Sequence, residues 1–214
     1  MVDPKIYAEN AQARAATDAP SEPQHHSTQA PNTASHNQPL DINIKKPFHR
    51  LHAKTWLHGR SERDVYKLLI DTYRLRVVED HNLTGNVDVD SPYGGATADG
   101  GTSGFRRFLR MAQRIPGLLP EWWCPAKTTE CIQMGCRTRG WNVEATITIR
   151  AIMMYYGDNS MPMQLRMLGE QIYGTGPGGQ NGAGVMQLQL QIESRGCETG
   201  YLDSSPLFHP QNDV

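Results

Sequence analysis

The sequence lacks the features that mark several large classes of protein. No apolar run approaches the roughly 18 residues that a membrane-spanning helix requires. Lys and Arg number 21 against 22 Asp and Glu, so the formal net charge is -1. The positive field typical of proteins that bind nucleic acid or acidic membranes is therefore missing, and we expect neither partner. Apolar residues make up only 38% of the 214 residues, below the roughly 45–50% of average globular chains. We therefore expect part of the chain to stay unfolded.

Cysteine is scarce, and residues 1–39 carry no targeting pattern. That segment has neither the basic start and apolar stretch of a secretory signal nor the arginine-rich, acid-poor composition of a mitochondrial presequence. We therefore expect a cytoplasmic or nuclear protein, reduced thiols, and no glycan at the Asn82 sequon. The four cysteines are Cys124, Cys131, Cys136 and Cys197.

The composition changes near Leu40 and divides the chain into three parts. Residues 12–40 are rich in Ala, Pro, Gln, Ser, Thr and Asn and have no large apolar residue before Leu40. Such a segment cannot bury enough apolar surface to offset its ordering entropy. The sequence therefore predicts a disordered linker over 1–40, a helical domain over 41–194 and an unstructured tail over 195–214.

The fold class predicted for the domain is mainly α, with about five to six helices after an irregular lead-in that ends near residue 60. Ser61 is a predicted N-cap, Pro116 ends the second helix, and Gly135 is a predicted stop for the third. The β-branched run at 146–149 also favours a strand, but helical neighbours favour a helix over 142–156. The helices are expected near 61–79, 105–115, 125–135, 142–156, 161–172 and 183–194.

The helical periodicity also predicts a core. Apolar residues recur at helical spacing and should face one another if the helices pack as a bundle. Truncating Leu69 to alanine would then cost about 2–5 kcal/mol. The predicted core residues are Leu68, Leu69, Phe105, Phe108, Leu109, Leu165 and Leu168.

Residues 174–179 match the dinucleotide-binding pattern G-x-G-x-x-G. That pattern binds pyrophosphate only between a strand and a helix. Here the preceding segment is predicted to be an amphipathic helix, so the context fails. We interpret this segment as a tight connection between two helices.

Histidines and cysteines offer candidates for a metal site or a nucleophilic pair, but their spacing favours neither. His49, His52 and His58 could join Cys124, Cys131 or Cys136 around a metal. Structural zinc sites use short CxxC-like pairs, which are missing here. No activating turn surrounds a cysteine, so a buried thiol is the favoured interpretation of Cys131. We assign no catalytic, cofactor-binding or metal-binding residue from the sequence.

Other conspicuous residues have ordinary interpretations. Trp122, Trp123 and Trp141 are expected to be core anchors, and Met161, Met163 and Met167 to fill gaps in the core. Arg106, Arg107 and Arg110 are expected to form a solvated helix face, although the same stripe could contact an acidic partner. If the protein were an enzyme, a deep polar pocket with a strongly perturbed group near His58, Asp71 or Glu170 would show it.

Long strings of the sequence carry a resemblance to a known family. They cover most of residues 45–193 and resemble the region that follows the zinc finger in fungal MYND-type zinc-finger proteins. The resemblance implies a two-zinc finger upstream, but Asp3 and Tyr7 stand where its last His and Cys would be. The zinc function is therefore not carried over, and no cofactor is expected. The strings are residues 46–51, 55–60, 64–76, 93–95, 104–109, 116–123, 156–158, 161–170 and 173–179.

The resemblance leaves three hypotheses for function. MYND fingers elsewhere mainly bind proline-rich peptides of partner proteins, and the region seen here has no assigned reaction. The favoured hypothesis is a non-enzymatic interaction or regulatory domain with a protein partner. The alternatives are an accessory enzyme of unknown reaction in a fungal pathway and a residual zinc-binding protein.

Overall fold

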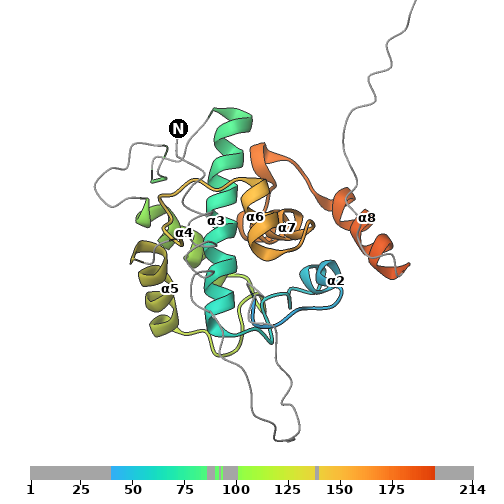
Figure 1. Ribbon diagram of the computed structural model, residues 1–214, viewed down its shortest axis with the longest axis horizontal. Coiled ribbons are helices and arrows are strands. Elements are labelled where there is room, and N and C mark those ends of the chain that lie inside the picture. The colour runs from blue at the N-terminus through green and yellow to red at the C-terminus, as the bar shows by residue number, and fades with distance from the viewer. Residues whose placement is uncertain (1–39, 86–89, 92, 94–100, 138–139, 196–214) are drawn as a thin grey trace, which may run out of the picture.

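The structure is a computed structural model that describes residues 40–85, 90–91, 93, 101–137 and 140–195. In this part the chain forms seven α-helices and one 3-10 turn, with no strand, so the mainly α prediction is confirmed (Figure 1). The predicted linker, the predicted tail after residue 195 and Cys197 lie outside the described residues. No helix in the described part is long and apolar enough to cross a bilayer. The elements are α2 (Pro47–His52), α3 (Glu62–Thr84), α4 (Thr102–Gln113), α5 (Pro125–Arg137), α6 (Ile149–Tyr156), α7 (Met161–Tyr173), η1 (Pro177–Gly179) and α8 (Ala183–Ser194).

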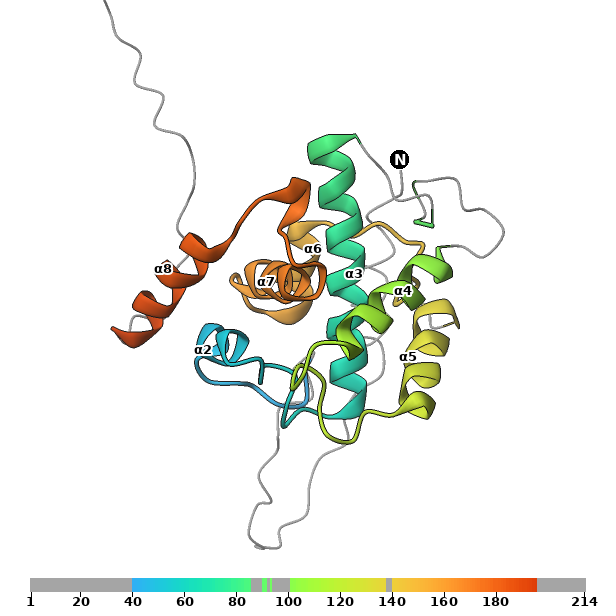
Figure 2. The same ribbon diagram turned by 180° about the vertical axis from the view of Figure 1, so that it is seen from behind.

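Helix α3 is the central element. Helices α4 and α5 lie on one side of it and α6 and α7 on the other, as Figures 1 and 2 show from opposite directions. Every residue from Asp64 to Arg76 is buried, which is expected of a helix with neighbours on all sides. Ser61 caps the N-terminus, since its hydroxyl accepts a hydrogen bond from the Asp64 amide. The predicted end near Glu79 is wrong, because the helix continues to Thr84 and ends at Gly85 with a left-handed φ of 65°.

The core lies between α3 and its neighbours, and all seven predicted core residues are fully buried. Four aromatic rings join α3, α4 and α7. The Phe108 ring lies 5.7 Å from those of Tyr73 and Tyr173 and 6.1 Å from that of Phe105. These contacts fix the position of α4 against α3, which in turn places the chain that leads into α5.

The irregular lead-in predicted before residue 60 is wrong at one place, because it contains α2. Pro47 starts this helix, and Phe48 and Leu51 are its buried residues. The Glu193 carboxylate of α8 accepts hydrogen bonds from the Phe48 and His49 amides at 2.9 and 3.0 Å. A carboxylate at the start of a helix satisfies amides that have no partner within the helix. This cap comes from 144 residues further along the chain, so local sequence could not reveal it.

Two other predicted boundaries are also wrong. Gly135 does not stop α5, which continues to Arg137. A Cβ at Gly135 would lie 3.0 Å from Val143 Cγ1 and 3.3 Å from Phe105 Cε1, so glycine there allows close packing. Helix α6 begins at Ile149 rather than 142, because the Thr148 hydroxyl caps it through the Ala151 amide.

The glycine-rich segment connects α7 to α8, as the sequence predicts. Gly174 ends α7 with a left-handed φ of 79°. The Arg76 guanidinium of α3 donates a hydrogen bond to the Thr175 carbonyl, and the Gly178 amide donates to Asp80 Oδ1 at 3.0 Å. The glycines therefore serve a tight turn that is held against α3.

Candidate functional site

An open groove with a volume of about 660 Å³ lies between the N-terminal half of α3 and one face of α5. The contributing residues of α5 follow the spacing i, i+3, i+4 and i+7, which places them on a single side of the helix. Helix α3 supplies its first turns, and the segment before it supplies the edge. The lining residues are Asp41, Ser61, Glu62, Arg63, Tyr66, Glu130, Gln133, Met134 and Arg137.

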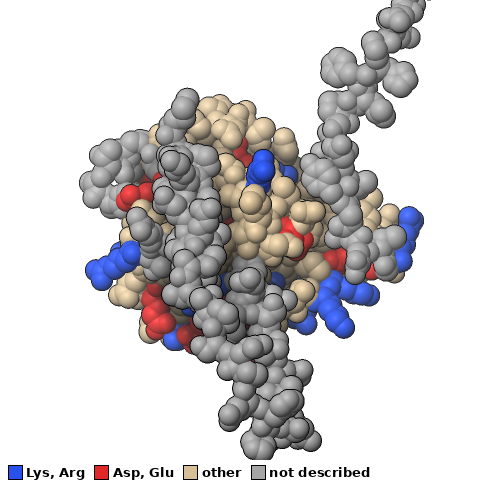
Figure 3. Space-filling model, viewed as in Figure 1, with Lys and Arg blue, Asp and Glu red and all other residues tan. Residues whose placement is uncertain are grey.

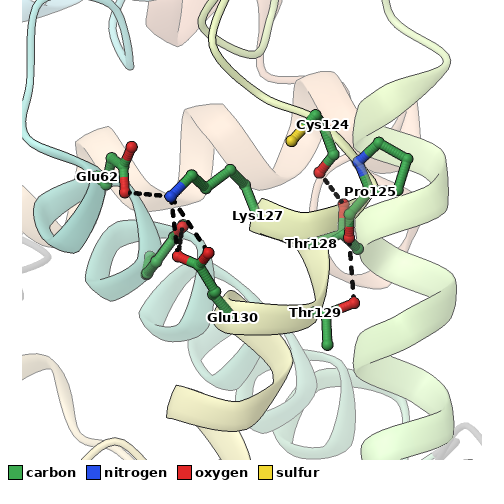
Figure 4. A network of polar contacts seen from close by, with 8 residues as sticks. Glu62, Cys124, Pro125, Lys127, Thr128, Thr129 and Glu130 are labelled. Carbon is green, nitrogen blue, oxygen red and sulfur yellow. Dashed lines mark hydrogen bonds and ion pairs between the residues drawn. The ribbon is translucent and has the colours of Figure 1, made fainter.

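Lys127 joins the two walls of the groove. Its ammonium lies 2.8 Å from Glu62 Oε2 on α3 and 3.1 Å from Glu130 Oε2 on α5 (Figure 4). The Tyr66 hydroxyl donates a hydrogen bond to Glu130 Oε2 at 3.0 Å. Burial, together with the neighbouring Glu130, raises the pKa of Tyr66, whereas the bond from Lys127 lowers the pKa of Glu130. The phenol therefore stays protonated and the carboxylate ionised at neutral pH.

The guanidinium groups of two groove arginines have no partner among the residues that the structure describes. Arg63 and Arg137 are both exposed, and neither makes a hydrogen bond or ion pair with the part of the chain that the structure describes. By contrast, Glu62 and Glu130 are bound by Lys127, and Asp41 Oδ2 accepts a hydrogen bond from the Ser61 hydroxyl at 2.7 Å. Each of the three groove carboxylates thus has a partner, whereas the two guanidinium groups have none within the described part of the chain.

A second polar cluster is buried on α3 and contains Asp71, a carboxyl group whose pKa is strongly shifted. Asp71 Oδ1 lies 3.0 Å from Arg74 Nη1, and the Tyr156 hydroxyl donates to Asp71 Oδ2 at 2.8 Å. One turn earlier, Lys67 pairs with Asp64 at 3.2 Å. Arg74 also donates to the Gly140, Ala145 and Thr146 carbonyls and so holds that irregular segment against α3. These side chains hold the 140–146 segment and α6 against α3.

The pKa of Asp71 is raised to about 6, chiefly because burial disfavours the charged form, with the Arg74 and Tyr156 contacts acting against it. Asp71 does not line the groove. His58 Nε2 lies 2.9 Å from the Gly117 carbonyl, and Glu170 Oε1 accepts from the Gly182 amide at 2.7 Å. His58, Asp71 and Glu170, the residues that an enzyme hypothesis would use, therefore each make a separate contact that stabilises the fold. No contact joins them in a common site among the described residues.

Metal-ligand candidates are also dispersed. His49 Nδ1 pairs with Glu193 Oε2 at 2.6 Å, and His52 is exposed. Cys131 is buried, and burial raises the pKa of its thiol. Cys124 and Cys136 are exposed free thiols. Among the described residues no three or more His, Cys, Asp or Glu side chains gather in a way that could hold a metal ion.

The raised pKa of Asp71 predicts an unusual pH dependence of stability. The folded state holds the Asp71 proton more tightly than the unfolded chain, whose carboxyl has the ordinary pKa of 3.8. The stabilisation from protonation is therefore complete below that value and lost as the pH rises through about 6. Lowering the pH from about 7.5 to about 5.5 should add about 1 kcal/mol to the free energy of unfolding through this group.

Urea unfolding of the wild type and of Asp71→Asn at both pH values checks this prediction. All other ionisable groups are the same in both proteins, so the difference between the two pH responses isolates Asp71. The same pH response in both proteins would show that burial does not govern this carboxyl.

On the face shown in Figure 3, basic and acidic side chains are interspersed rather than gathered by sign. This agrees with the near-zero net charge of the whole chain.

Comparison with protein-family models, with curated proteins and with solved structures finds no match to this chain.

Sequence reasoning did not identify the groove. Its α5 residues are mostly polar and stand at helical spacing, a signal that describes any solvated helix face. Which face of α3 meets that of α5 depends on how the two helices pack.

Proposed function

We propose that this chain is a non-enzymatic protein-interaction domain that binds a peptide segment of its partner in the α3–α5 groove. The observation that carries the proposal is an open groove whose lining combines Met134 and the Tyr66 ring with charged groups. Protein-recognition surfaces are rich in such aromatic, methionine and arginine side chains. The perturbed carboxyl group of Asp71 is buried in the core away from the groove, and the raised pKa of Tyr66 keeps the groove phenol protonated, which favours binding over a reaction at this place.

The proposal extends to family. We propose a fungal MYND-finger-like protein that lacks its zinc ligands, supported by the residue strings at 46–51, 64–76 and 161–170. Two of these strings form helices that build the groove or pack against the helix that builds it. Residues 64–76 are the buried part of α3, and residues 161–170 belong to α7, which packs on α3.

A selection of random peptides displayed on phage, panned against the full chain, tests the function. Enriched peptides are synthesised and their dissociation constants measured by fluorescence anisotropy. The decisive variant is Gln133→Trp, which places a large ring in the groove at an exposed α5 position. The matched control is Gln187→Trp, at an exposed position of α8 outside the groove.

The Gln133→Trp variant is expected to weaken binding by roughly tenfold or more, a loss of about 1.4 kcal/mol. Gln187→Trp should leave affinity unchanged within about twofold. A selection that enriches no peptide, or peptides that bind Gln133→Trp as well as the wild type, would refute the groove as a docking site.

A further inference from the structure

We infer that the segment bound in the groove is an acidic peptide, recognised through Arg63 and Arg137. The inference rests on the proposed function and adds the chemistry of the partner. It depends on which polar side chains of the groove already have a hydrogen-bond partner. It depends also on the fact that the two arginines without one in the described part of the chain come from different helices.

The unused hydrogen-bond donors of the groove favour a ligand that carries acceptor groups. A guanidinium carries five N–H donors and no acceptor, and Arg63 and Arg137 use none of theirs within the described part of the chain. The two residues belong to α3 and α5 respectively, yet both line the same groove. A ligand lying in it therefore meets open donors from both helices.

The carboxylates of the groove do not offer an equal site for a basic ligand. Lys127 lies between Glu62 and Glu130 and contacts both. Glu130 also accepts from Tyr66, and Asp41 from Ser61. A basic ligand that paired with Glu62 and Glu130 at once would have to displace Lys127, whereas an acidic ligand can pair with Arg63 and Arg137 without breaking a contact that the structure shows.

Arginine suits this role better than lysine would. Its planar fork can bind a carboxylate through two parallel hydrogen bonds, which gives geometric selectivity as well as attraction. Tyr66 and Met134 supply apolar surface in the same groove. The segment that fits best is one in which Asp or Glu side chains alternate with an apolar side chain.

The phage selection against the full chain also tests this inference, through the composition of the enriched peptides. For each peptide, a counterpart with Asn and Gln in place of Asp and Glu is synthesised. The chain variant is Arg63→Gln combined with Arg137→Gln. Its charge-matched control combines Arg106→Gln with Arg110→Gln, two exposed arginines of α4 that lie outside the groove.

We expect enrichment of Asp and Glu, and a loss of affinity of roughly tenfold or more for the amide counterparts and for the Arg63→Gln, Arg137→Gln protein. The α4 control should change affinity by less than about twofold at physiological salt, because neither arginine lines the groove and salt weakens attraction between exposed charges that are not in contact.

The two proposals fail in different ways. Enriched peptides that are sensitive to Gln133→Trp but neutral or basic would leave the groove as a docking site and overturn the acidic partner. Equal losses in the α4 control would show general charge attraction and overturn the role of the two arginines. Failure to enrich any peptide would overturn the groove itself, and this inference with it.

Discussion

Replacing Arg74 with methionine is expected to lower the free energy of unfolding by about 3–5 kcal/mol, the cost of leaving a buried charge without its partner. Arg74 and Asp71 are both almost completely buried and lie 3.0 Å apart. Without the guanidinium, Asp71 keeps only the Tyr156 hydroxyl as a partner besides the nearby Lys67. The carbonyls of residues 140, 145 and 146 also lose the hydrogen bonds that Arg74 donates to them. Urea unfolding at about pH 7.5, where Asp71 is ionised, measures the effect.

The double variant Asp71→Asn, Arg74→Met separates the charge from the packing. Because it removes both charges, it should lose less stability than Arg74→Met alone, with a coupling energy of about 1–3 kcal/mol. If the double variant lost the sum of the two single effects, the pair would not be coupled and the interpretation of the cluster would fail.

Replacing Leu69 with alanine is expected to cost about 2–5 kcal/mol, because the surrounding side chains cannot close the cavity completely. Leu69 is fully buried in the N-terminal half of α3, the helix that contacts α4, α5, α7 and η1. Thermal or urea unfolding of the full chain gives the loss directly. The groove is built on the same helix, so this stability is a condition for binding.

Leu83→Ala is the matched control, since it makes the same chemical change on the same helix at a side chain that is 58% exposed. Its cost should stay within about 0.5 kcal/mol, as for most surface substitutions. A Leu69→Ala loss well under 1 kcal/mol, comparable to the control, would mean that α3 is not central to the core.

Local patterns predicted the helices well where the signals act within a few residues. Ser61 caps α3 and Pro125 starts α5, as expected of residues whose effect is exerted on the adjacent turn. The ends at Gly85 and Thr148 were missed although their caps are local, and other predictions failed because a distant residue decided the outcome. The α2 cap comes from Glu193, and Gly135 is needed for close approach of Val143 rather than to end a helix.

The candidate site was predictable only in part. The sequence points to Asp71 as one group whose pKa a polar pocket would perturb. The pKa of Asp71 is raised, but the cause is burial in the core beside α3's own partners and not a pocket. The groove residues Arg63, Glu130 and Arg137 were not singled out. Charged residues at helical spacing describe a solvated face, and only helix packing turns two such faces into a groove.

By itself the sequence determined the helical class, the apolar core and the helix–helix role of the glycine-rich segment, because periodicity, capping and turn chemistry act locally. Only the tertiary structure decided which charges are buried together on α3, which carboxylate caps α2 and which faces of α3 and α5 enclose a groove. Those features join residues up to 145 positions apart, and such pairings depend on how whole helices pack rather than on any short stretch of chain.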